Sequence, residues 1–254
     1  NLNKLISARH RGNQFISTWR TTTANETITL PTPTNYNVNW GDGTVTTNTN
    51  SHVYAIAGDY EIKIRGEITD FRFNNTGDKE KILEVSNFGR LYLVNACFFG
   101  CENLNFIDDN FKALGISLGS AFRDCLKLNS PMYSLDTAGV VNLTSFFRGA
   151  AAFNQDLNHL DMSSVDTIYL MFFGATSFNG DISSWDVSNV ESISLSFFSA
   201  SSFNGDLSNW ITTSLTNCGG AFQGATLFNS DIGNWDVSNV IFMNGMFRQT
   251  SFNH

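Results

Sequence analysis

Charged residues are scarce in this sequence, and long apolar runs are absent. Asp, Glu, Lys and Arg make up 15% of the 254 residues, against about 25% in a typical soluble protein. The net charge is −8, and no stripe of Lys and Arg is present to displace counterions from phosphates, so we expect no binding to nucleic acid. No apolar run reaches the roughly 18 residues of a membrane-spanning helix, so we expect no membrane insertion in this segment.

Several enzyme motifs are missing too. There is no H-E-x-x-H pair and no phosphate-binding loop, and His10, His52, His159 and His254 fall at unrelated positions. Asp42 and His52 could be taken for an acid–base pair, but a turn residue with a strand-end hydrogen bond is the simpler interpretation. We therefore expect that the protein is not an enzyme.

A repeat of about 25 residues fills the second half of the chain. A loose unit covers residues 97–120, and a partial copy begins at Met246. A period in the twenties predicts a solenoid, in which each coil buries its apolar face against the next. The regular units, without insertions between them, cover residues 121–145, 146–170, 171–195, 196–220 and 221–245.

Three apolar columns recur at fixed places in these units. If the coils stack about 4.8 Å apart, the columns become continuous apolar spines, and the 23 phenylalanines belong to the core rather than to a cofactor site. The first column contains Phe98, Phe122, Phe147, Phe172, Phe197, Phe222 and Phe247; the second contains Leu104, Leu128, Phe153, Phe178, Phe203, Phe228 and Phe252; the third contains Leu135, Leu160, Trp185, Trp210 and Trp235.

An asparagine follows the second column in every unit. A repeated amide at a turn can bond the backbone of its own loop and of the next coil, which satisfies groups that would otherwise be buried unpaired. These residues are Asn105, Asn129, Asn154, Asn179, Asn204, Asn229 and Asn253.

Residues 14–70 follow a period of two instead. Tyr36, Val38 and Trp40 alternate with asparagines, as in a strand with one buried face. The motif W-G-D-G-T at residues 40–44 suits a tight hairpin. Together with H-x-Y-x-x-x-G-x-Y-x-I-x-I at residues 52–64, it resembles the polycystic-kidney-disease-type β-sandwich of many bacterial surface proteins. The resemblance implies a spacer or an accessory adhesion module.

The repeat carries a second resemblance. C-F-F-G-C-E-N-L at residues 97–104 and A-F-R-D-C-L-K-L at residues 121–128 resemble the F-x-x-C-x-x-L pattern of BspA-like, treponemal-type leucine-rich repeats. The later M-F-x-G-A-x-x-F-N-x-D-I-x-x-W-D-V-S-N-V units are similar to the repeats of roughly 25 residues in bacterial and mycoplasmal surface proteins. Ile211 departs from the pattern, because it replaces the aspartate of W-D-V-S-N. The resemblance covers residues 97–254 and implies a solenoid displayed outside the cell and used for attachment.

We therefore predict a mainly β protein. Residues 1–12 are a leader or linker, residues 13–70 a β-sandwich, residues 71–96 an irregular first coil and cap, and residues 97–254 a leucine-rich-repeat-like solenoid of about seven coils of 24–25 residues. Because the start lacks a signal peptide and the last unit is partial, we expect a segment of a larger bacterial protein, located at the cell surface or secreted.

The four cysteines take positions that are small or apolar in other units, which favours buried free thiols. A disulfide between Cys101 and Cys125, in neighbouring units, is the alternative. Zinc is not expected, because no C-x-x-C pair is present.

Aspartates recur in two further columns. Stacked carboxylates repel one another, so each needs compensation. Capping of backbone N–H groups is one solution, and calcium, which takes six to eight oxygen ligands, is the other; we expect no other cofactor. The candidate calcium ligands are Asp156, Asp181, Asp206 and Asp231, and the second column contains Asp136, Asp161, Asp186 and Asp236.

The outward positions of the expected strand face are mostly small and polar. Tyr169 and Phe242 are large, and Ile241 adjoins Phe242, so these three are the candidate ligand-binding residues; ordinary surface hydrophobes are the alternative. We expect non-covalent adhesion to a host or neighbouring-cell surface protein or a glycan. The alternatives are a rigid structural spacer, or self-association into a homodimer through the end of the solenoid.

Overall fold

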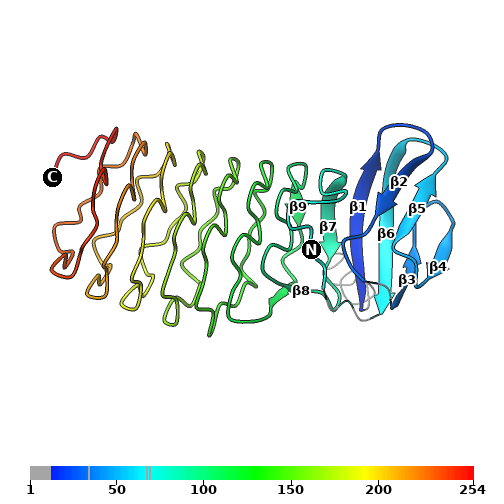
Figure 1. Cartoon of the computed structure of the whole chain (residues 1–254), viewed down its shortest axis with the longest axis horizontal. Coiled ribbons are helices and arrows are strands. Elements are labelled where there is room, and N and C mark those ends of the chain that lie inside the picture. Colours follow the sequence, from blue (N-terminus) through cyan, green and yellow to red (C-terminus); the bar gives the residue numbers. More distant parts are fainter. Residues whose placement is uncertain (1–12, 34, 67, 69) are drawn as a thin grey trace, which may run out of the picture.

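A computed structural model describes residues 13–33, 35–66, 68 and 70–254 of the chain. These residues form short strands in mixed sheets and contain no helix, so none of them belongs to a helix long and apolar enough to cross a membrane. Figure 1 shows an elongated molecule, with strands β1 to β6 at one end and a row of coils extending from them to the C-terminus. The prediction of a mainly β protein is confirmed.

The described residues form one six-stranded sheet and two pairs of strands. The six-stranded sheet has the order β4-β3-β6-β1-β7-β9, while β2 pairs with β5 and β8 with β10. The strands are β1 (Gln14–Thr21), β2 (Glu26–Thr29), β3 (Tyr36–Asn39), β4 (Val45–Thr47), β5 (Ser51–Tyr54), β6 (Gly58–Gly66), β7 (Ile82–Asn87), β8 (Tyr92–Leu93), β9 (Phe106–Ile107) and β10 (Lys112–Ala113).

The W-G-D-G-T motif forms the hairpin that its sequence predicts. The N–H of Trp40 donates to the carbonyl of Thr44 at 3.0 Å, and the N–H of Thr44 donates to Oδ1 of Asp42 at 2.9 Å. Gly43 takes a φ of 97°, a value that favours glycine. The Tyr54 hydroxyl donates to the carbonyl of Trp40 at 2.8 Å, so this residue of β5 ties the hairpin to the sheet beside it.

Strand β1 connects the N-terminal strands to the coils. It pairs antiparallel with β6 on one side and with β7 on the other, and β7 then pairs parallel with β9. The predicted cap at residues 71–96 therefore supplies a strand, β7, to the sheet that begins in the N-terminal part. Hydrogen bonding runs from the first strands into the first coils without a break.

An ion-pair network reinforces this junction. Nζ of Lys81 lies 3.0 Å from Oε1 of Glu26 on β2 and 3.0 Å from Oδ1 of Asp78. The Glu26 carboxylate also accepts the N–H of Thr22 at 2.6 Å. The hydrogen bond from Thr22 and the bond from Lys81 lower the pKa of Glu26 to about 2. The ionised form of Glu26 therefore stabilises the folded junction.

Residues 97–254, which we call the coil stack, are joined by parallel backbone hydrogen bonds between successive units. The N–H of Phe172 donates to the carbonyl of Ser196 at 2.8 Å, and the N–H of Phe197 donates to that of Ala221 at 2.8 Å. This register places each residue beside its counterpart in the next unit. Figure 1 shows the resulting row of similar turns.

The apolar columns predicted from the repeat are stacked side chains. Phe197 has its ring centroid 5.4 Å from that of Phe172 and 5.3 Å from that of Phe222, and 4.1 Å from Phe203 of the second column. In the third column, the rings of Trp185 and Trp210 lie 6.0 Å apart with an interplanar angle of 11°. These aromatics are buried and belong to one hydrophobic cluster.

The buried indoles and the exposed asparagine amides are both paired between units. The indole N–H of Trp185 donates to the carbonyl of Leu157 at 2.8 Å. Oδ1 of Asn154 accepts the N–H of Asn179 at 2.8 Å, and Oδ1 of Asn179 accepts that of Asn204 at 2.8 Å. From Asn129 to Asn229 the asparagine column is thus a ladder in which each amide oxygen accepts a backbone N–H of the next coil, as the sequence predicts. These amides are exposed, however, and not buried as the sequence analysis expects.

We expect the Phe197→Ala substitution to lower the free energy of unfolding by about 3 to 5 kcal/mol, because it leaves a cavity between two stacked rings. Urea denaturation followed by circular dichroism measures the change. The matched control is Phe242→Ala, whose ring is 56% exposed and whose loss should have little effect. Equal effects of the two substitutions would show that the column is not the core.

Ionised Glu26 contributes to the free energy of unfolding, because its pKa in the folded state lies below the ordinary value of 4.5. We expect this contribution to be lost as the pH falls from about 4.5 to about 2. Glu26→Gln should therefore lower stability at pH 7 and give a shallower decline in that range. The control is Glu80→Gln, a carboxylate that is 65% exposed. Identical pH profiles for wild type and Glu26→Gln would contradict the assigned role.

Candidate functional site

One surface of the coil stack is built on a row of parallel β-bridges. Side chains between its outward positions point into the core, since Ile168, Ile193 and Cys218 are buried. We call this surface the bridge face and define it by the bridged residues and the residues two positions later. Its members are Ser117, Gly119, Asn142, Thr144, Thr167, Tyr169, Ser192, Ser194, Asn217, Gly219, Phe242 and Asn244.

Two of the three candidate binding residues belong to this face, and the third adjoins it. Tyr169 is 39% exposed, Phe242 56% and Ile241 73%. Three successive bridges separate Thr167 from Phe242, so Tyr169 and Phe242 lie on units that are not neighbours. The structure brings Ile241 and Phe242 together at one end of the face and leaves Tyr169 apart from them.

A hollow of about 340 Å³ opens in the bridge face beside Phe242. We call it the glycine hollow, because Gly219 and Gly220 line it where the three preceding units carry larger residues. The residues equivalent to Gly219 in the three preceding units are Thr144, Tyr169 and Ser194, and those equivalent to Gly220 are Ser145, Leu170 and Leu195.

Carboxamides surround the glycine hollow. A Cβ atom on Gly219 would lie 3.2 Å from Oδ1 of Asn244 and 3.3 Å from Oδ1 of Asn217, so any larger residue would occupy space between these amides. Oδ1 of Asn217 accepts the N–H of Gly219 at 3.0 Å. Its Nδ2 and the side-chain amides of Gln223 and Asn244 have no hydrogen-bond partner in the described part of the chain. No charged side chain is among the described residues that line this hollow.

The glycine hollow was not among the sites predicted from the sequence. Gly219 and Asn244 occupy predicted outward positions, but only the large residues at such positions were predicted to bind a ligand. A departure within the repeat is the signal that could have found the site. The preceding units read I-Y-L at residues 168–170 and I-S-L at residues 193–195, whereas residues 218–220 read C-G-G.

The repeated aspartates act as turn caps. Oδ1 of Asp181 accepts the N–H of Ser183 at 3.0 Å, and Oδ1 of Asp186 accepts both the N–H of Ser188 at 3.1 Å and its hydroxyl at 2.6 Å. These hydrogen bonds lower the pKa of both carboxylates. Capping thus compensates the repulsion that stacking creates.

The candidate calcium ligands form a row along the stack. Oδ1 of Asp156 accepts the N–H of Asp181 at 2.8 Å, and Oδ1 of Asp206 and Asp231 accepts the N–H two residues later at 2.9 Å. One carboxylate oxygen of each aspartate is therefore used by the backbone. No cluster of three or more His, Cys, Asp and Glu side chains suited to a metal occurs within the described ranges. The calcium hypothesis stays a prediction.

The Asp42 and His52 pair belongs to the hairpin. Nε2 of His52 lies 2.7 Å from Oδ2 of Asp42, and the His52 ring stacks on Trp40 with centroids 5.2 Å apart. Burial raises the pKa of Asp42, but hydrogen bonds from His52 and Thr44 outweigh it and hold the pKa below its ordinary value. This geometry matches the structural interpretation of the pair.

Residues 115–119 read G-I-S-L-G, so the expectation that the sequence contains no serine nucleophile elbow motif is wrong. Oγ of Ser117 lies 3.4 Å from Nδ2 of Asn95 and 3.5 Å from the N–H of Gly119. Ser117 also forms a parallel bridge with Asn142. The serine thus lies in the row of bridges, whereas a nucleophile elbow lies at a strand-to-helix turn.

The four cysteines are buried free thiols. The Sγ of Cys97 donates to the carbonyl of Phe71 at 3.1 Å, and that of Cys125 to the carbonyl of Phe98 at 3.2 Å. Burial raises the pKa of Cys97 to about 12, so this thiol is unreactive at neutral pH. The alternative of a disulfide between Cys101 and Cys125 is wrong, because these residues pack as separate thiols in the core.

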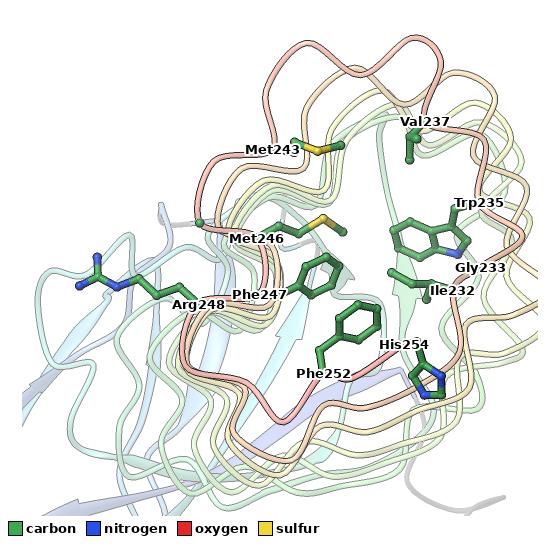
Figure 2. Close-up of a pocket in the computed structure, with 11 residues that line it drawn as sticks. Ile232, Gly233, Trp235, Val237, Met243, Met246, Phe247, Arg248, Phe252 and His254 are labelled. Carbon is green, nitrogen blue, oxygen red and sulfur yellow. The ribbon is translucent and has the colours of Figure 1, made fainter.

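Two other hollows have different linings. Figure 2 shows Trp235, Met246, Phe247 and Phe252 facing a space of about 510 Å³ at the C-terminal coil. These aromatics are the last members of the stacked columns, so the space is apolar. A hollow of about 460 Å³ at the junction includes Lys81 and its ion-pair partners in its lining, and those charges already satisfy one another.

We expect Asp186→Ala to lower the free energy of unfolding by about 1 kcal/mol, because the Ser188 N–H and hydroxyl lose their acceptor. Asp186→Asn should cost less, since its amide oxygen still accepts the N–H. Thermal melts of both variants test the capping role. If the wild-type melt also falls with a chelator and recovers with added calcium, the aspartate row binds the ion; under capping alone we expect no such shift.

Comparison with known proteins adds a family assignment. The family model described as "Mycoplasma protein of unknown function, DUF285" matches residues 92–210 and residues 181–254. No curated protein and no solved structure matches the chain. The two family matches together span residues 92–254, which is more than half of the chain and includes the whole coil stack. The chain therefore belongs to the DUF285 family.

Proposed function

We propose that this chain is a non-catalytic adhesion segment of a larger bacterial surface protein. In this proposal the coil stack is a leucine-rich-repeat-like solenoid of about seven coils, displayed outside the cell. The N-terminal strands form a polycystic-kidney-disease-like sandwich that acts as a spacer or accessory module. The observation that carries the proposal is the bridge face, a row of small polar residues interrupted by the exposed rings of Tyr169 and Phe242.

The bridge face has the physical properties of a binding surface. Its backbone is fixed by hydrogen bonds between units, such as the 3.0 Å bond from the Leu195 N–H to the Gly219 carbonyl, so little conformational entropy is lost on binding. Exposed aromatics supply large contact areas and are enriched among residues that dominate binding energy. Because uncharged residues make up the face, ligand binding requires little desolvation of charge.

Two alternatives to adhesion follow from the sequence analysis. In the first, the chain is a rigid spacer, which requires the stacked columns but not the exposed rings of Tyr169 and Phe242. The other alternative is self-association into a homodimer through the end of the solenoid, where Phe247 and Phe252 line an apolar hollow (Figure 2). Two copies meeting there would bury apolar side chains of both.

We expect the fluorescently labelled chain to bind host or neighbouring cells saturably, and the Tyr169→Ala and Phe242→Ala variants to bind at least about tenfold more weakly. Matched controls are Tyr133→Ala and Leu227→Ala, which remove exposed side chains outside the bridge face (69% and 58% exposed). Flow cytometry over a concentration series, with thermal melts of each variant, gives the result.

Saturable binding that all four variants retain would show that another surface is responsible. Absence of binding by the well-folded chain would favour the spacer. Sedimentation velocity of the same samples tests the second candidate, because self-association predicts a sedimentation coefficient that rises with concentration. Phe252→Ser should abolish that rise.

A further inference from the structure

We propose that the glycine hollow is a subsite for a neutral sugar ring. This inference rests on the proposed adhesive function and deepens it, because it names the chemical class of the ligand and the place where one ring binds. Three features of the hollow carry it: an exposed aromatic ring at its edge, carboxamides with unused hydrogen-bonding groups, and a lining without charge.

The aromatic edge is Phe242. Its ring is 56% exposed and lines the hollow beside Gly219. One face of a pyranose ring presents C–H groups, which pack against an aromatic face and remove apolar surface from water. Ile241, which precedes Phe242 and is 73% exposed, is not among the described residues that line the hollow. Leu195 also lines the hollow, so its apolar contacts come from Phe242 and Leu195.

The carboxamides are those of Asn217, Gln223 and Asn244. A carboxamide has both a donor and an acceptor, as does a sugar hydroxyl, so one amide can bond two neighbouring hydroxyls. The intramolecular hydrogen bonds leave this capacity available, because Asn217 uses only Oδ1, toward the N–H of Gly219. Ser194 donates its hydroxyl to the Gly219 carbonyl at 3.0 Å and keeps its acceptor lone pairs.

The absence of charge in the lining favours a neutral polar ligand over a charged one. Since no charged side chain lines the described hollow, a sulfate or carboxylate on the ligand would lose hydration without gaining an opposite charge. An apolar protein side chain would bury the carboxamides unpaired. A neutral sugar ring avoids both costs, because its hydroxyls pair the amides and its C–H face covers Phe242.

The hollow depends on Gly219, which gives a sharp test. Thr144 occupies the equivalent position three units earlier, so threonine is compatible with this place in the fold. In the Gly219→Thr variant the side chain would fill the space between Asn217 and Asn244, where a Cβ already lies within 3.3 Å of both side-chain oxygens. The control is Thr144→Ser, a change on the same face away from the hollow.

We expect the full chain to bind an immobilised array of neutral oligosaccharides of glucose, galactose, mannose and N-acetylglucosamine, with sialylated and sulfated counterparts bound more weakly. Gly219→Thr and Phe242→Ala should each weaken binding at least about tenfold, while Thr144→Ser binds as wild type. Thermal melts of all variants should match, which separates loss of the hollow from loss of the fold.

Three results would overturn the inference: no neutral oligosaccharide bound by the wild type, a preference for the charged counterparts, or wild-type binding by Gly219→Thr. If cells are still bound through Tyr169 and Phe242 in any of these cases, the adhesive function stands and only the sugar subsite fails. If neither cells nor oligosaccharides are bound, both proposals fail.

Discussion

Parallel backbone hydrogen bonding between successive units is the constraint on which the rest of the structure depends. Once the N–H of Phe172 bonds the carbonyl of Ser196, and the N–H of Phe197 that of Ala221, each side chain lies beside its counterpart in the next unit. Like residues must then pack on like. Aromatic rings meet this condition well, because flat faces stack without voids, as the rings of Phe222 and Phe247 do at 6.0 Å with an interplanar angle of 1°.

The same register determines how polar groups enter the stack. A buried indole N–H is tolerated only with a partner, and the preceding unit supplies its acceptor. The exposed asparagine amides instead accept a backbone N–H of the following unit. Oδ1 of Asn204 accepts the N–H of Asn229 at 2.7 Å, and the indole N–H of Trp210 donates to the carbonyl of Ile182 at 3.1 Å. A shift of register would leave these groups unpaired and misalign the rings, so polar ladders and apolar columns specify one alignment together.

Residues at outward positions need not pack against their counterparts in the next unit, and the candidate site lies at these positions. The interior of a unit must match its neighbours, but the bridge face can vary from coil to coil without loss of packing. The glycine hollow is such a variation, since it combines Gly219 and Gly220 with Gln223 and Asn244 from the adjoining unit. In a repeat protein, the positions where the pattern fails on an exposed face are therefore the natural candidates for recognition.

The sequence by itself determined the period, the buried columns, the asparagine ladder and the outward positions of Tyr169 and Phe242, because all of these follow from periodicity in a stack that repeats one contact pattern. Only the tertiary structure decided what depends on contacts between distant or dissimilar segments. It pairs β1 with β7 and sets Lys81 against Glu26, which joins the N-terminal strands to the coils. The tertiary structure also creates the hollow at Gly219, because a hollow forms only where the surrounding side chains leave space. The period of the repeat does not specify which side chains surround a given position.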